Sequence, residues 1–229
     1  MAWFIECPFC HKSVFRWFYS GHESGHTERR ADGQMNEHVT LAPEKRFEGS
    51  LDGVPQAYRH AKCGVATGMP EEIIRTYLVD PLTYNDSSFC CGCSNYVNSS
   101  DLFWMETNES VMSYMSRLRS EHVRTRYGID SSRAEITFTP EAIRQLRSIQ
   151  AQVGQPSYLV LRLIQLEMDV NYKLDMIPHW DQEVDDLVRQ TEMDVVVRKD
   201  QRKRLKGTIV HYNLSGRGFV IGRLYPWTY

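Results

Sequence analysis

The sequence predicts an α+β fold in two parts, a loop-rich N-terminal domain and a mostly antiparallel β C-terminal domain with one main helix. Two observations predict this division. All six cysteines and six of the eight histidines precede residue 128, among stretches rich in Gly, Pro and polar residues that are typical of loops. After residue 133, one helical pattern is followed by a series of short apolar strands. The predicted domains are therefore residues 1–128 and 134–229.

Charge and hydrophobicity restrict the kind of partner. The chain has a formal net charge of -2, so it offers no global polycation, and we do not expect a nucleic-acid partner. No apolar run approaches the roughly 20 residues that span a bilayer, and the first ten residues lack the pattern of a secretion signal. Six cysteines in such a chain favour reduced thiols, metal binding and a cytoplasmic location.

Two Cys-x-x-Cys motifs carry the main functional signal. Cys7 and Cys10 form the first, and Cys90 and Cys93 form the second. Two intervening residues allow a tight turn to direct both sulfurs to one point, and four thiolates complete a tetrahedral zinc site with no open position. We therefore predict one structural zinc bound by these four cysteines, in a zinc-knuckle or zinc-ribbon-like domain. The alternative is a single iron on the same thiolates.

A mixed motif lies between these two. His60 and Cys63 are spaced like another pair of ligands, and they could complete a second metal site or replace a member of the first. Packing or surface exposure is the simpler interpretation of such a pair. Cys91 lies between two predicted ligands, and we expect its thiol to point away from the metal.

One motif suggests catalysis. His22, Glu23 and His26 satisfy the His-Glu-x-x-His pattern, in which two histidines bind zinc and the glutamate activates water in zinc peptidases. The pattern requires a helix, and Gly21 and Gly25 disfavour one. We therefore expect a polar loop that contributes one histidine to a metal, and a zinc-dependent hydrolase is the alternative. The neighbouring aromatics are expected to form a small core rather than a stacking surface for bases: Trp3, Phe4, Phe15, Trp17, Phe18 and Tyr19.

Two helices are predicted in the N-terminal domain. The first spans 70–79, where Pro70 suits the first position and two glutamates follow it. The second spans 108–127, where Val111, Met115 and Leu118 share one face. Gly128 ends this helix, and a polar linker follows it.

The C-terminal domain is predicted to begin with a short strand that leads into its main helix. Thr139 suits the cap and Pro140 the first turn, and the stripe of Ala142, Leu146 and Ile149 suits burial. Alternating and apolar runs then predict five strands, at 158–166, 170–177, 195–198, 208–212 and 218–224.

From residue 136 to residue 221 the sequence resembles the A-type iron-sulfur carrier family, also called HesB-like. Three segments carry the resemblance: Ile136-Thr137-Phe138-Thr139-Pro140-Glu141-Ala142 as the opening strand and helix, 186–198 as a central hairpin, and 205–219 as the closing strands. The resemblance implies a HesB-like fold for this part of the chain.

The cluster ligands of that family are missing. Its members bind iron or a cluster with one cysteine after the second strand and a Cys-x-Cys pair near the C terminus. Here the corresponding segments, 166–170 and 225–229, contain no cysteine. Because function depends on the site rather than on the fold, we expect a non-catalytic zinc-binding protein with an adaptor role and a protein partner. The resemblance implies a link to iron-sulfur or metal handling. An iron or iron-sulfur protein that uses the N-terminal cysteines is a further alternative.

Overall fold

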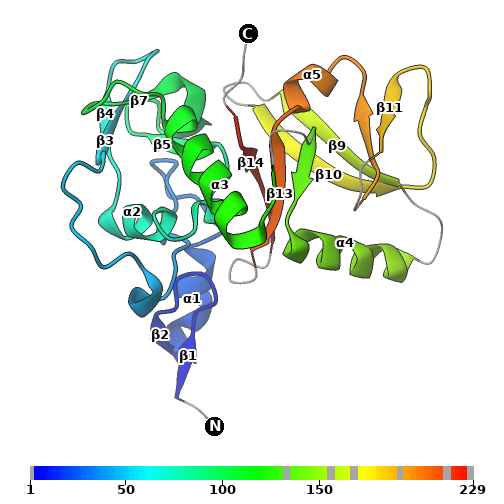
Figure 1. Ribbon diagram of the computed structural model, residues 1–229. Helices are drawn as coiled ribbons and strands as arrows, with labels where there is room; N and C mark the ends of the chain where they lie inside the picture. The colour runs from blue at the N-terminus through cyan, green and yellow to red at the C-terminus, as the bar shows by residue number, and fades with distance from the viewer. Residues whose placement is uncertain are drawn as a thin grey trace.

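The computed structural model describes residues 3–130, 135–153, 158–165, 170–189, 193–213 and 218–225. Its first unit is a small hairpin followed by a helix. Strand β1 (Phe4–Glu6) pairs antiparallel with β2 (Ser13–Phe15), and the short 3-10 helix η1 (Arg16–Phe18) leads into α1 (Tyr19–Ser24). This unit projects from the rest of the molecule and carries the N terminus at its tip (Figure 1).

The rest of the N-terminal half contains two small antiparallel sheets and two helices. One sheet has the strand order β4-β3-β7, and the other is the β5-β6 hairpin. The elements are η2 (Pro43–Lys45), β3 (Ala57–His60), β4 (Ala66–Gly68), α2 (Glu71–Tyr77), η3 (Pro81–Thr83), β5 (Ser87–Cys90), β6 (Asn95–Asn98), η4 (Ser99–Asp101), β7 (Leu102–Trp104) and α3 (Val111–Tyr127).

Both predicted helices of this half are present but shorter, α2 at both ends and α3 at its N-terminal end. Helix α2 begins after Pro70, which takes the cap position. Helix α3 begins at Val111 because the Ser110 hydroxyl accepts a hydrogen bond from the Ser113 amide, and it ends at Gly128 in the left-handed conformation. The aromatic rings of Tyr58, Tyr77, Trp104 and Tyr114 pack against one another in the core of this half.

The C-terminal half is mostly antiparallel. One sheet has the order β10-β9-β12-β11, the other β14-β13-β8, and only the pairs β12–β9 and β13–β8 are parallel among the described strands. The elements are β8 (Ile136–Phe138), α4 (Pro140–Val153), β9 (Tyr158–Gln165), β10 (Val170–Ile177), β11 (Asp185–Val188), β12 (Val195–Arg198), α5 (Arg202–Leu205), β13 (Thr208–Asn213) and β14 (Gly218–Arg223).

The predicted α+β fold is confirmed, and so is the local chemistry at the start of α4. The Thr139 hydroxyl accepts a hydrogen bond from the Ala142 amide at 3.3 Å, and Pro140 is the first helical residue. Ala142 and Leu146 of the predicted stripe are buried, together with Ile143. The predicted hairpin also forms, with β11 antiparallel to β12.

The two halves are in contact along helix α3. A small buried cluster combines Leu82 and Val123 of the first half with Ile209 and Leu224 of the second. Figure 1 shows α3 beside the central strands β13 and β14. The separation into domains at 1–128 and 134–229 stays a prediction. Within the described residues, no helix is long and apolar enough to cross a membrane.

Candidate metal centres

The structure brings together Cys7, Cys10, His22 and His26 as a first group, with all four ligand atoms within 4.8 Å of one another. Cys7 Sγ lies 3.4 Å from His26 Nε2, and Cys10 Sγ lies 3.2 Å from His22 Nε2. The two Nε2 atoms are 3.4 Å apart. Two sulfurs and two imidazole nitrogens therefore converge on one point, an arrangement that could hold a metal ion.

Local structure produces this convergence. The turn between β1 and β2 is closed by the Cys7 amide, which donates to the Lys12 carbonyl, and by the His11 amide, which donates to the Cys7 carbonyl. Helix α1 carries His22, and the turn that follows it carries His26, one helical turn further on. Residues four apart on a helical path lie on one face, so both rings reach the same point.

The surroundings of the first group are partly charged. Glu37 Oε1 lies 3.8 Å from His22 Nδ1, while its other oxygen accepts a hydrogen bond from Lys12 Nζ at 2.7 Å. Burial would raise the pKa of Glu37, but the hydrogen bond and charge of Lys12 outweigh it and lower the pKa overall. Glu37 therefore stays ionised beside His22, where it favours the imidazole orientation that directs Nε2 to the group.

A second group consists of His60, Cys63, Cys90 and Cys93. His60 Nδ1 lies 3.4, 3.5 and 3.3 Å from the sulfurs of Cys63, Cys90 and Cys93, respectively. The sulfurs of Cys63 and Cys90 are 3.5 Å apart. One nitrogen is thus in contact with three sulfurs, which is again an arrangement that could hold a metal ion.

Two tight turns build the second group. His60 ends β3, and the turn after it is closed by the Gly64 amide, which donates to the His60 carbonyl. Cys90 ends β5, and the Cys93 amide donates to the Cys90 carbonyl at 3.2 Å. Gly92 has no room for a side chain, because a Cβ there would lie 2.6 Å from Val65 Cγ2 and 2.9 Å from Cys63 Sγ.

Burial favours the neutral form of four of these ligands in the absence of a cation. It raises the pKa of the Cys10 and Cys93 thiols to about 11 and lowers the pKa of His26 and His60. Among the described residues, His26 Nδ1 and His60 Nε2 are buried without a hydrogen-bond partner. Neutral imidazoles are the form that binds a metal, and thiols lose their protons when a cation binds them.

The prediction of one four-cysteine site is wrong in its grouping. Cys7 and Cys10 meet two histidines, whereas Cys90 and Cys93 meet His60 and Cys63. Each pair finds its partners within its own region, so the two Cys-x-x-Cys motifs do not share one point. Cys91 is exposed and belongs to neither group.

The expected loop at 22–26 is also wrong, because α1 extends through Ser24. Gly25 follows it in a helical conformation, so the glycines do not prevent the turn. The motif therefore brings both His22 and His26 to the first group instead of one of them. Glu23 is exposed and accepts a hydrogen bond from the Tyr19 hydroxyl at 3.3 Å.

Spacing in the sequence could have revealed both groups. Cys-x2-Cys followed after eleven residues by His-x3-His is close to the spacing of small zinc fingers, which pair a hairpin with a helix. The second group combines His-x2-Cys with Cys-x2-Cys. The signal that identifies each group is therefore the match of a Cys pair to its nearest histidines, rather than the match of one Cys pair to the other.

The positions that correspond to the missing cluster ligands of the A-type carriers, 166–169 and 226–229, lie outside the described residues. Apart from the two Cys/His groups, the described ranges hold no cluster of three or more Cys, His, Asp or Glu residues with the geometry of a metal site.

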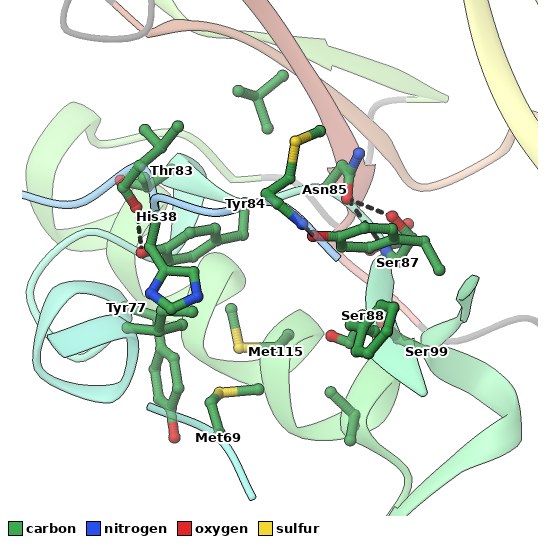
Figure 2. A pocket seen from close by; sticks show the side chains of 18 of the residues that line it. His38, Met69, Tyr77, Thr83, Tyr84, Asn85, Ser87, Ser88, Ser99 and Met115 are labelled. Atoms are coloured by element: carbon green, nitrogen blue, oxygen red, sulfur yellow. Dashed lines mark hydrogen bonds between the residues drawn. The ribbon is translucent and has the colours of Figure 1, made fainter. Parts of the chain in front are cut away.

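A cleft of about 850 Å³ lies between the two halves and reaches His26 of the first group. Its lining is mixed: Figure 2 shows His38, Tyr77 and Tyr84 on one side of it, Ser88 and Ser99 on the other, and two methionines between them. The second half contributes residues of β10 and β14. No pattern in the sequence predicts this cleft, because its walls come from segments that are remote in the chain.

Neither a scan against protein-family models nor a search of curated proteins found a match. Solved structures similar to part of the chain include the following two. One is a crystal structure of Escherichia coli SufA, involved in biosynthesis of iron-sulfur clusters, with 22% identity and a TM-score of 0.33, covering 40% of this chain and 82% of SufA. The other is IscA with a 2Fe-2S cluster, with 21% identity and a TM-score of 0.33, covering 38% of this chain and 84% of IscA. A likeness this partial says nothing of what the chain does.

Proposed function

We propose that each Cys/His group binds one zinc ion as a closed structural site, and that the chain is a non-catalytic two-zinc protein with an adaptor role. The distances between ligand atoms carry this proposal. A tetrahedral zinc ion with Zn–S of about 2.3 Å and Zn–N of about 2.0–2.1 Å has edges of roughly 3.3–3.8 Å between its ligands. Seven of the twelve distances within the two groups are 3.2–3.5 Å, and all ligand atoms of each group lie within 4.8 Å of one another.

Zinc fits these donors better than iron. Two cysteines with two histidines, and three cysteines with one histidine, are both common donor sets of structural zinc. Because all four atoms of each group lie within 4.8 Å of one another, each group suits one ion rather than a cluster of several. No cysteine follows Cys93 in the chain, so carriage of an iron-sulfur cluster by the second half is not part of the proposal.

A hydrolase is disfavoured by the same donor count. A catalytic zinc keeps one position open for water or substrate, whereas two thiolates and two imidazoles would fill all four positions in the first group. Glu23 would have to activate that water, and its carboxylate is instead exposed and bonded to Tyr19. The zinc ions would therefore stabilise two small folds, and the biological role would come from the surfaces that those folds present.

Elemental analysis of the purified protein tests the proposal. We expect two zinc ions per chain in the wild type. One ion should remain in the Cys10→Ser variant, and one should remain in the Cys93→Ser variant. Cys91→Ser is the matched control, because this cysteine lies beside the ligands and belongs to neither group; it should keep both ions. Visible absorption from bound iron, or zinc content that does not respond to the first two substitutions, would contradict the proposal.

A further inference from the structure

The small unit formed by β1, β2 and α1 exposes large aromatic rings. Trp3, Phe4, Trp17 and Phe18 are 66%, 58%, 76% and 71% exposed, respectively. The expectation that these aromatics form a small core is therefore wrong for these four. We call them, together with Phe15, the aromatic face.

The aromatic face is organised around Phe15. Its ring stacks on Trp3 at 6.1 Å, and meets Phe4 and Trp17 edge to face at 5.5 and 5.3 Å. Phe4 and Phe15 are directly opposite in the β1–β2 register. Because the unit projects from the rest of the molecule (Figure 1), the rings lie on a part of the protein that another molecule can approach.

The exposed area is large enough to need a partner. Each large aromatic side chain offers about 150–250 Å² when fully exposed, so the four rings present on the order of 500 Å² per chain. Single exposed apolar residues are ordinary, but a contiguous patch of this size marks an interaction surface. Two such faces in contact would bury about 1,000 Å², or roughly 1,200 Å² with their polar rims, which is the lower end of specific interfaces.

The charges around the face are self-complementary. Arg16 is exposed between Phe15 and Trp17 and has no ion pair among the described residues. Glu6 shares a face of the hairpin with Phe4, two residues away, and its side chain is 69% exposed while one oxygen contacts His11 Nδ1 at 2.9 Å. In a two-fold dimer, Arg16 of each copy can meet Glu6 of the other copy, so the same contact forms twice, as an isologous interface requires.

Nucleic acid suits the face poorly. A stacking platform for bases needs several cations to follow the phosphates. Here Arg16 is the cation among the rings, Lys12 is paired with Glu37, and the exposed carboxylates of Glu6 and Glu23 lie in the same small unit.

We propose that the aromatic face binds a second copy of this chain, forming a two-fold symmetric dimer through the N-terminal units. Trp17 and Phe18, the most exposed rings, supply the centre of the interface, and Arg16 pairs with Glu6 of the other copy at its edge. The dimer rests on the proposed function in one respect, since the first zinc ion would hold the hairpin and α1 in the arrangement that displays the rings.

Sedimentation equilibrium between about 1 and 200 µM tests the dimer, a range that suits a small interface. We expect a reversible monomer–dimer equilibrium for the wild type, and a dissociation constant at least 30-fold higher for Trp17→Ser with Phe18→Ser. Met105→Ser is the matched control, because Met105 is 58% exposed outside the aromatic face; it should leave the equilibrium unchanged.

A charge exchange tests the symmetry. Arg16→Glu and Glu6→Arg should each weaken the dimer several-fold, and the double exchange should restore it, because each pair then forms again with reversed charges. A wild type that stays monomeric at about 200 µM, a dimer that survives loss of Trp17 and Phe18, or a monomer that binds vesicles of phosphatidylcholine would overturn the proposal.

The zinc content of every sample is also measured, so that failure of the dimer proposal can be distinguished from failure of the proposed function. A monomeric wild type with two zinc ions overturns the dimer alone. A dimer that lacks zinc but depends on Trp17 and Phe18 overturns the proposed function alone.

Discussion

Arg119 Nη1 lies 2.5 Å from Asp86 Oδ1, and the two side chains are only 1% and 5% exposed. The guanidinium also donates hydrogen bonds to the backbone carbonyls of Pro81, Tyr84, Asn85 and Arg223. The first three belong to the N-terminal half, whereas Arg223 ends β14 in the second half. One buried cation on α3 therefore joins the two halves, and it is balanced by one buried carboxylate.

Replacing Arg119 with Met should destabilise the protein by about 3–5 kcal/mol, because Asp86 and several carbonyls would remain buried without their donor. Urea unfolding measures the change. Arg117→Met is the control, because this residue lies on the same helix and its side chain is 62% exposed. Its pair with Glu109 is long and its guanidinium lies 5.0 Å from the centroid of the Tyr114 ring, so the free energy of unfolding should change by no more than about 1 kcal/mol. Similar losses for both variants would show that the buried pair does not join the halves.

Gly92→Ala should remove the zinc proposed for the second group while leaving the first group intact. The added Cβ would lie 2.6 Å from Val65 Cγ2 and 2.9 Å from Cys63 Sγ, so the turn or the sulfur must move. We expect one zinc ion per chain by elemental analysis. Gly68→Ala provides the comparison, because a Cβ added at Gly68 would meet no atom within 4 Å; that variant should retain two ions.

Elements with strong local signals could be predicted from the sequence, and those that depend on distant partners could not. The cap at Thr139 and the left-handed Gly128 define helix ends through contacts within a few residues. The alternating pattern of 170–177 likewise predicts the strand that forms there. Because residues close in the sequence determine these features, they can be predicted without knowledge of distant contacts.

The ligand grouping could not be settled by the cysteine spacing, because two identical Cys-x-x-Cys turns do not say which partners they meet. Closing the loop from Cys10 to His22 fixes far fewer residues than closing one from Cys10 to Cys90, and loop closure costs more entropy as the loop grows. Local histidines therefore complete the first group. The exposed rings of Trp17 and Phe18 show a second limit, since an apolar residue type does not reveal whether a small unit has enough volume to bury it.

Glu37→Gln should weaken zinc binding by the first group about 10-fold or more, because a carboxylate beside a metal-binding histidine orients the ring and increases its basicity. Glu37 lies 3.8 Å from His22 Nδ1 and is held by Lys12. Competition with a chromophoric chelator measures the affinity. Glu23→Gln is the control from the neighbouring helix, and it should leave the affinity unchanged; equal effects of the two substitutions would contradict the assigned role of Glu37.

Two histidines lie near the contact of α3 with β13: His211 is buried, and His122 is partly buried. His211 Nδ1 is 3.0 Å from the Thr139 hydroxyl, and His122 Nε2 is 3.9 Å from Asp80. Burial lowers the pKa of both rings, and it outweighs the opposing carboxylates of Asp80 for both rings and of Glu141 for His211. Arg126 lowers the pKa of each ring further.

Acid should therefore destabilise the protein through these two rings. Their folded pKa values lie below the unfolded value near 6.5, so above that pH neither state is protonated and the rings add no pH dependence. Below it the unfolded state takes up protons first, and stability falls as the pH decreases towards 5. Replacing His122 with Gln and His211 with Asn should reduce the loss of unfolding free energy between pH 7 and pH 5, measured by urea titration at each pH. The wild type and the double variant both keep the two Cys/His groups, so acid release of any metal bound there affects both equally, and the difference between them reports the two rings. His179→Gln, at an exposed position, is the control, and its unfolding free energy should depend on pH as that of the wild type does. If the double variant also kept the wild-type dependence on pH, protonation of His122 and His211 would not destabilise the fold.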